Sequence, residues 1–231
     1  MKDRAKVICH MITSINGNAV TPLLADTNLS AASEVYTEQV LSFGKAWGCG
    51  RNTFQKVASA PVDLSQYRGK SVSYEDKVIA GEDGRYCVAF DRYGKLLWNT
   101  DIGPYWGGKI LEVLTEQVTP EFVAYLDDMK ISYMFAGKED FEPEVFLKKL
   151  KEKYQIDTFV LAGGPSINGI FMEKNLIDEI NLVITPGVDG ILHGTFFAGA
   201  EELSAFPKYF RVKEVKQFGN DVINLQYERQ S

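Results

Sequence analysis

The stretch FVLAGGPSINGIFMEKNLIDEINLVI, residues 159–184, decides how this chain folds. It runs from a short apolar segment into Gly163-Gly164-Pro165-Ser166, then into a helix-like pattern and a second apolar segment. Strand, corner, helix and strand in this order are typical of a parallel crossover unit whose strands are buried on both faces. The corner has two interpretations: a backbone cradle for a phosphate, or the tight turn that any strand-to-helix junction needs.

The same alternation of strands and helices extends upstream of this stretch. The patterns predict strands at residues 6–12, 46–49, 86–91, 109–114, 131–135 and 158–162, and helices that begin near 33, 51, 119 and 143. Residues 96–98 are predicted to return as a strand after a turn at 92–95. Alternating residues around 219–221 predict a closing antiparallel hairpin. We therefore expect an α/β fold with a mostly parallel central sheet and a C-terminal antiparallel hairpin, in a single domain over residues 1–231.

The composition excludes several classes of protein. The chain has 231 residues, of which 45% are hydrophobic, and its net charge of −6 argues against a nucleic-acid surface. No apolar run approaches the roughly 18 residues of a membrane span, so we expect no membrane partner. Three widely spaced cysteines favour a reducing, cytoplasmic compartment. The two histidines have no second ligand at metal spacing, so no metal site is predicted.

A second corner repeats the design of the first. Gly50-Arg51-Asn52-Thr53 follows a predicted strand and opens a helix; Arg51 adds a guanidinium fork and Thr53 a hydroxyl group. The unpaired N–H groups of a helix N-terminus suit a phosphate, provided that no Cβ blocks its approach. Neither corner matches a named nucleotide fingerprint. Together with Arg92, which follows a third strand, the two corners favour a dinucleotide with several phosphates.

These segments carry a family resemblance that spans nearly the whole chain. The matching pieces are, in order, Ser14-Ile15-Asn16-Gly17, the corner at 50–53, YCVAFDRYGKLLW, Val113-Leu114-Thr115-Glu116 and LAGGPSINGIFMEKNLIDEINLVITP. The chain resembles the reductase family typified by the C-terminal domain of the riboflavin-biosynthesis protein RibD. This resemblance implies a three-layer, dihydrofolate-reductase-like fold and a homodimer.

The resemblance also implies an NADPH-dependent reductase that reduces a small heterocyclic substrate. It points to the backbone of Ile12 for the nicotinamide, and to Arg51 and Arg92 for the adenosine 2′-phosphate. For the pyrophosphate it points to the two corners, through Thr53, Gly163, Gly164, Pro165, Ser166 and Ile167. The planar guanidinium group of arginine can donate two hydrogen bonds to the oxygens of one phosphate, so arginines are also expected at such a site on physical grounds.

The substrate side departs from the family pattern. Riboflavin-pathway members carry an arginine where spacing places Ser42, and a glutamate where this chain has Ala162, which puts a phosphorylated substrate in doubt. Glu34 and Asn16 remain as candidate catalytic residues. Glu34 stands 51 − 34 = 17 residues before Arg51, a spacing that resembles the active-site carboxylate of dihydrofolate reductases.

A buried Glu34 with a raised pKa would anchor a heterocycle and help deliver a proton. An acid that merely complements the first turn of a helix is the other interpretation of the same residue. Two alternatives to the riboflavin-type reductase therefore stay open: a dihydrofolate- or pterin-type reductase, and a non-catalytic NADPH-binding module.

Overall fold

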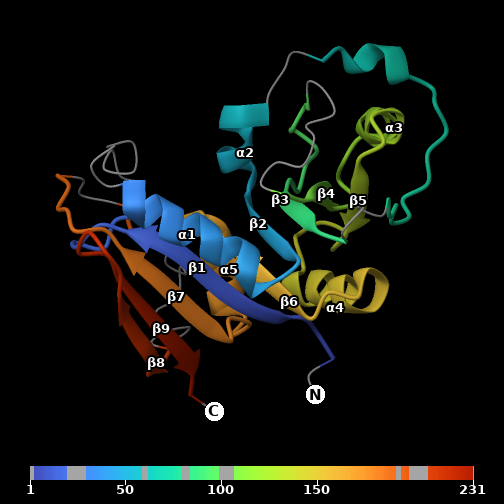
Figure 1. The fold of residues 1–231 in the computed structure, drawn as a ribbon. Helices are drawn as coiled ribbons and strands as arrows, with labels where there is room; N and C mark the ends of the chain where they lie inside the picture. The colour runs from blue at the N-terminus through green and yellow to red at the C-terminus, as the bar shows by residue number, and fades with distance from the viewer. Residues whose placement is uncertain are drawn as a thin grey trace. The chain divides into compact units, whose positions relative to one another are not determined.

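A computed structural model describes residues 3–19, 30–58, 62–79, 84–98, 107–190, 194–197 and 208–230, with the side chains of 56–58 left out (Figure 1). The chain divides into two compact units. The first comprises Met1–Ala5 and Lys45–Phe159, and the second Lys6–Gly44 and Val160–Ser231. Strand β6 (Thr158–Leu161) contains the boundary.

The first unit is built on four parallel strands. They lie in the order β5-β4-β3-β2, with bounds Ala46–Gly50 for β2, Tyr86–Phe90 for β3, Lys109–Leu114 for β4 and Ser132–Phe135 for β5. Trp47 pairs with Cys87, and Val88 with Leu111, in parallel register. All residues of β3 are buried, as expected for a strand with a neighbour on each side and helices on both faces.

Helices cover both faces of these strands. The helices are α2 (Arg51–Ala58), the 3₁₀ helix η3 (Leu64–Tyr67), α3 (Pro120–Asp128) and α4 (Pro143–Tyr154). Phe54 of α2 packs against Trp47, with ring centroids 6.1 Å apart. On the other face, Phe146 of α4 packs edge-on against Phe90 at 5.1 Å. Thr119 caps α3 by accepting the N–H of Phe122.

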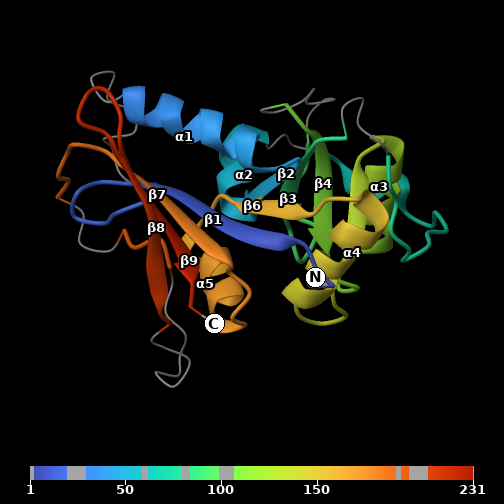
Figure 2. The same cartoon turned by 60° about the horizontal axis from the view of Figure 1, so that its bottom comes forward.

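The second unit combines parallel and antiparallel pairing. Strands β1 (Lys6–Thr13) and β7 (Glu179–Ile184) are parallel, whereas β9 (Ile223–Arg229) runs antiparallel to β7 and to the edge strand β8 (Phe210–Gln217). Figure 2 shows α1 (Ser30–Phe43) and α5 (Pro165–Glu173) on opposite sides of β1 and β7. The parallel sheet and the antiparallel C-terminal hairpin predicted from sequence are therefore confirmed.

Helix α1 packs on an apolar cluster and on a buried histidine, His10 of β1. Ile12, Ala32, Val183 and Val222 form a buried apolar cluster. Beside it, the buried His10 stacks on Tyr36 at 4.4 Å, and its Nε2 lies 2.9 Å from the carbonyl oxygen of Tyr36. Burial lowers the pKa of His10 to about 4 against the opposing effect of its hydrogen bonds, so the imidazole is neutral at pH 7.

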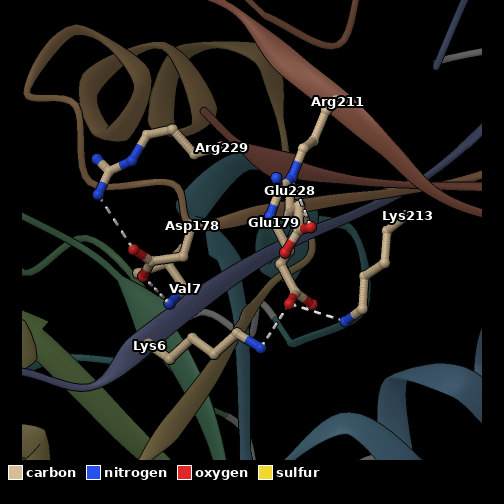
Figure 3. Close-up of polar contacts among 8 residues, drawn as sticks. All are labelled: Lys6, Val7, Asp178, Glu179, Arg211, Lys213, Glu228 and Arg229. Carbon is tan, nitrogen blue, oxygen red and sulfur yellow. Dashed lines mark hydrogen bonds and ion pairs between the residues drawn. The ribbon is translucent and has the colours of Figure 1, made fainter. Parts of the chain in front are cut away.

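Ion pairs at Glu179 join three strands of the second unit, β1, β7 and β8, at one end (Figure 3). Glu179 of β7 accepts the ammonium groups of Lys6 on β1 at 2.7 Å and of Lys213 on β8 at 2.9 Å. A bulge between Val212 and Glu214 leaves Lys213 outside the β8–β9 ladder. Figure 3 shows Lys213 reaching Glu179 from this position.

Two predicted elements differ in the structure. The helix predicted near Ser33 begins at Ser30, so Ser33 lies inside α1 and is not its cap. The return strand predicted at 96–98 is wrong, because β3 pairs in parallel with β2 and β4 and Trp98 is instead buried against Phe54. No helix of the described ranges is long and apolar enough to cross a membrane.

Candidate functional site

The glycine corner of the second unit leads from β6 into α5. Gly163 has a φ of +93°, which favours glycine, and a Cβ there would lie 3.0 Å from the sulfur of Met11. The peptide bond between Gly163 and Gly164 is cis. Gly164, the N-cap of α5, is different: a Cβ added to it would meet no atom within 4 Å. The surface over Gly164 is therefore open to a ligand.

The first turn of α5 offers hydrogen-bond donors at this corner. Pro165 occupies the first helical position and has no N–H, while the N–H of Asn168 is the first to bond back, to the carbonyl of Gly164 at 3.1 Å. The N–H groups of Ser166 and Ile167 thus have no partner within the helix. The Ser166 side chain is exposed and that of Ile167 is buried. Such a turn can bind an anion through its backbone.

Ile12 lies next to the end of β1. Its side chain is 7% exposed and belongs to the apolar cluster beneath α1, and its backbone is in register with Val183. Any contact with a ligand would therefore come from the backbone, as the sequence interpretation required.

Asn16 closes the loop after β1. Its amide nitrogen donates to Asp189 Oδ1 at 3.1 Å, and its amide oxygen accepts the Asp189 N–H at 3.2 Å. The buried Asn18 also donates to Asp189 Oδ1, at 2.5 Å, and accepts the N–H of Gly194 at 3.1 Å. Sequence reasoning did not predict Asp189, because 173 residues separate it from Asn16. The asparagine side chains thus fix the loop to a distant segment.

Glu34 does not have the environment that the sequence interpretation gave it. The structure places this carboxylate on the exposed side of α1, so the expected burial is wrong. Because α1 begins at Ser30, Glu34 also lies beyond the first turn, which holds no acidic residue. The helix start explains the second error, whereas burial was expected from the spacing to Arg51 and the resemblance to dihydrofolate reductases.

The corner of the first unit presents Arg51 as the first residue of α2. Its Nη1 donates to Gln55 Oε1 at 2.6 Å, and its Nε lies 4.0 Å from Asp91 Oδ1. Thr53, two residues further along α2, is exposed. Burial raises the pKa of the neighbouring Cys49 thiol to about 12, against a hydrogen bond from Thr53 that lowers it. The thiol is therefore protonated and unreactive at neutral pH.

Arg92 directly follows Asp91, beyond the end of β3. Its Nε donates to the carbonyl of Glu139 at 3.1 Å, its Nη2 pairs with Asp140, and its guanidinium lies over the Tyr93 ring at 4.6 Å from the centroid. This guanidinium is thus already held by an acid of the same unit. Asp140 is 76% exposed, so the pair is accessible to a competing anion.

Two buried acids of the first unit were missed by sequence reasoning. Asp91 and Glu112 are 1% and 0% exposed. Burial raises the pKa of both carboxyls; the negative charge of Asp91 raises that of Glu112 further, whereas backbone N–H groups and Arg51 oppose the rise at Asp91. A single acid within the apolar run KILEVL was the available signal. The described residues contain no group of three or more potential metal ligands.

Comparison with known proteins identifies the family. The family model described as "RibD C-terminal domain" matches residues 95–224, which is more than half of the chain. The chain belongs to the RibD C-terminal domain family. The match includes β4 to β8, the corner at Gly163 and Gly164, and the first two residues of β9.

Relatives agree with this family. Over 78 residues the chain is 31% identical to the riboflavin biosynthesis protein RibD of Buchnera aphidicola, which covers 33% of the chain and 21% of that protein. RibD of Acinetobacter baumannii superposes with a TM-score of 0.69 at 17% identity, covering 99% of this chain and 59% of the other. The chain therefore spans well under two thirds of both proteins.

Two shorter proteins are covered almost completely. A pyrimidine reductase-like protein of Corynebacterium diphtheriae superposes with a TM-score of 0.69 at 14% identity, covering 98% of this chain and 92% of the other. The riboflavin biosynthesis reductase of Saccharomyces cerevisiae superposes with a TM-score of 0.59 at 12% identity, covering 100% and 92%. At these identities the likeness concerns the fold, which is the dihydrofolate-reductase-like fold of RibD-type reductases.

Proposed function

We propose that this RibD-type reductase uses NADPH and transfers a hydride to a small heterocyclic substrate resembling 5-amino-6-(5-phosphoribosylamino)uracil. Membership of the RibD C-terminal domain family supports the reductase class. The single observation that carries the cofactor assignment is the open corner at Gly164, the N-cap of α5, where an added Cβ would meet no atom within 4 Å.

The residues of each corner have distinct tasks in this proposal. In the second unit the N–H groups of Ser166 and Ile167 bind pyrophosphate oxygens, while the Ser166 hydroxyl adds a donor and Pro165 fixes the first turn of the helix. Gly164 keeps a side chain away from that surface, and Gly163 provides the positive φ of the turn that leads to it. The backbone of Ile12 supports the nicotinamide. When bound, NADPH supplies the hydride, and the chain supplies position and a proton.

In the first unit, Arg51 and Thr53 bind cofactor oxygens. We assign the adenosine 2′-phosphate to Arg51 before Arg92. The Arg51 guanidinium donates to the neutral amide of Gln55 and lies 4.0 Å from the carboxylate of Asp91, whereas the Arg92 guanidinium already forms an ion pair with Asp140. Arg92 would contribute by exchanging its exposed ion pair with Asp140 for the phosphate. NADPH should therefore bind more tightly than NADH.

Substitution of Gly164 tests the cofactor site directly. Gly164→Ala adds a methyl group that meets no protein atom within 4 Å, at a φ of −76° that any residue adopts. Gly219→Ala, in the β8–β9 turn, adds a methyl group that is equally free and serves as the matched control. We expect on the order of tenfold weaker NADPH binding for the first variant and unchanged binding for the second, measured by nicotinamide fluorescence. Equal affinity for both variants would remove the corner from the site.

We also propose Glu34 and Asn16 as the catalytic residues of the second unit. An exposed carboxylate exchanges protons with water, so Glu34 can relay a proton to the substrate. Asn16 would hold the substrate-side loop through Asp189. Loss of turnover in Glu34→Gln with unchanged NADPH affinity is the expected result; full activity of that variant would exclude Glu34.

The substrate is tested by turnover. Ser42 and Ala162 occupy the positions of two family substrate contacts, and Ser42 is exposed on α1 with its hydroxyl donating to the carbonyl of Gln39 at 3.0 Å. We therefore propose an aminopyrimidine substrate that does not depend on a phosphate. The assay compares the ribosylamino substrate with and without its phosphate, following NADPH oxidation. NADPH binding without oxidation by either substrate would leave a binding module.

We further propose a cytoplasmic homodimer formed through the C-terminal hairpin. Val212 and Val215 of the edge strand β8 are 59% and 60% exposed, and they pair with Tyr227 and Leu225, which share one face of β9. A second copy would cover this apolar face. Light scattering should give the dimer mass for the natural protein and the monomer mass for Val212→Lys/Val215→Lys. A monomeric natural protein would contradict the proposal.

A further inference from the structure

The first unit contains two buried acids, Asp91 and Glu112, whose side chains point to the same face of the sheet. Glu112 of β4 is in register with Ala89 of β3, and Asp91 follows Ala89 by two residues. Side chains two residues apart on a strand lie on the same face, and the Asp91 N–H extends the ladder by donating to the Val113 carbonyl at 3.0 Å. The two carboxyl groups are therefore neighbours in the protein interior.

The two oxygens of Asp91 have different partners. Oδ2 accepts the backbone N–H groups of Lys95 and Leu96, the latter at 2.6 Å, which fixes the carboxylate to the turn after β3. Oδ1 faces the Nε of Arg51 at 4.0 Å. One oxygen thus holds the loop while the other faces the guanidinium.

Glu112 has weaker support. Its Oε1 accepts the Nε1–H of Trp98 at 2.6 Å, and its Oε2 has no hydrogen-bond partner among the described residues. The Tyr125 hydroxyl does not compensate, since it donates to the Trp98 carbonyl at 2.7 Å. Two neighbouring carboxyl groups in a medium of low dielectric resist ionising together. The acid with backbone donors and a facing guanidinium is Asp91, so the shared proton belongs on Glu112.

We propose that Asp91 is the positioning residue for Arg51, and that Glu112 stays neutral behind it so that Asp91 carries the charge. The guanidinium is then held from two sides, by Gln55 at Nη1 and by Asp91 at Nε, which leaves its remaining N–H groups for the phosphate. The inference rests on the proposed NADPH function. It explains why a buried acid pair lies next to a cofactor corner.

A double-mutant cycle on NADPH affinity tests the positioning role. Asp91→Asn keeps an oxygen for the N–H groups of Lys95 and Leu96 but removes the charge that faces Arg51. We expect it to weaken NADPH binding about fivefold to tenfold, with little change for NADH, which lacks the 2′-phosphate. In an Arg51→Gln background the same substitution should have no further effect, because Asp91 acts through Arg51.

Glu112→Gln tests the protonation state in the same assay. Glutamine reproduces the neutral acid and keeps an acceptor for Trp98, so NADPH affinity should stay within about twofold of the natural protein. Circular dichroism and thermal unfolding check that each variant is folded. If Asp91→Asn does not fold, Asp91→Ser replaces it, since the hydroxyl still accepts a backbone N–H.

Several results would overturn the inference. Equal weakening by Asp91→Asn with and without Arg51 would mean that Asp91 acts through the fold alone. An effect of Arg51→Gln without any effect of Asp91→Asn would mean that Arg51 needs no positioning. A large loss of affinity in Glu112→Gln would place the charge on Glu112. A folded natural protein that binds no NADPH would instead refute the proposed function itself, and the inference with it.

Discussion

Two glutamates of this protein, Glu179 of β7 and Glu112 of β4, have pKa values that are shifted in opposite directions. Glu179 accepts two lysine ammonium groups and keeps 16% of its side chain exposed. Burial works to raise its pKa, yet the bonds from Lys6 and Lys213 bring that pKa below its ordinary value. Glu112 has one neutral donor, Trp98, and a neighbouring acid, so burial and charge both raise its pKa. A buried carboxylate stays ionised only where cations reach it.

The position of each glutamate explains the difference. Glu179 begins β7 in the second unit, where long side chains from β1 and β8 reach it from the surface (Figure 3). Glu112 lies in the interior of β4, and β3 and β5 flank it. The first arrangement keeps the carboxylate of Glu179 ionised at the end of the sheet, and the second keeps the carboxyl group of Glu112 protonated in the core.

The largest expected effect is on Trp98. Trp98→Phe removes the only N–H donor that Glu112 has among the described residues, and it also leaves space beside Phe54. We expect a loss of about 3 kcal/mol in the free energy of unfolding, measured by urea denaturation at pH 6. In a Glu112→Leu background, Trp98→Phe should cost less free energy of unfolding, because the hydrogen bond between Trp98 and Glu112 is already absent. An equal loss in both backgrounds would assign the whole effect to packing.

The pH dependence of Glu112→Gln comes next. The folded pKa of Glu112 is raised above its ordinary value of 4.5, so its contribution to stability is full below that pH and is lost as the pH rises toward the folded pKa. The variant lacks this loss. We expect the variant to gain about 2 kcal/mol on the natural protein between pH 5 and 8, against a ceiling of about 1.4 kcal/mol per pH unit. Parallel stability curves would contradict a neutral Glu112.

Glu179→Gln should show the mirror image. Because the folded pKa of Glu179 is lowered, its stabilisation is present above its ordinary value of 4.5 and is lost as the pH falls through the folded pKa. The variant should be about 1 kcal/mol less stable at pH 7, and the difference should vanish on acidification. Thermal unfolding between pH 3 and 7 measures it. A difference that persists at pH 3 would mean that charge is not the cause.

The smallest expected effect is on Glu228, which accepts Arg211 at 2.8 Å on the exposed surface of the hairpin. The two side chains are 35% and 68% exposed, so water and salt screen the pair. Glu228→Gln should reduce stability by about 0.3 kcal/mol at low salt and by nothing measurable in 1 M NaCl. A loss of stability as large as that of Glu179→Gln would contradict the expectation that an exposed ion pair stabilises the fold less than a partly buried one.

Local pattern was enough for most elements. The apolar run at Lys109–Leu114, Pro143 at the start of α4, and the alternating residues around Gly219 all predicted the structure. These features work because strand and helix periodicity and proline geometry act over a few residues. The strand-to-helix corner at Gly163 and Gly164 was also predicted, because the residues that form it are adjacent in the sequence.

Errors arose where distant residues decide. Leu96–Trp98 has the pattern of a return strand, but β3 already pairs with β2 and β4, and Asp91 instead holds Lys95 and Leu96 in a turn. Glu34 was expected to be buried from its spacing to Arg51, but the structure exposes its side chain on α1. The contact of Asn16 with Asp189 joins residues 173 apart. Local propensity contains no information about such contacts.

The sequence by itself determined the α/β order of elements, the glycine corners and the family, because each rests on residues that are adjacent along the chain. Only the tertiary structure decided the charge state of the acids. Glu112 lies inside an apolar run and Glu179 begins its strand, but the local sequence does not show which charged groups reach either carboxylate. What separates them is whether strands distant in sequence bring cations or another acid to the carboxylate, since the free energy of a buried charge depends on its neighbours in space.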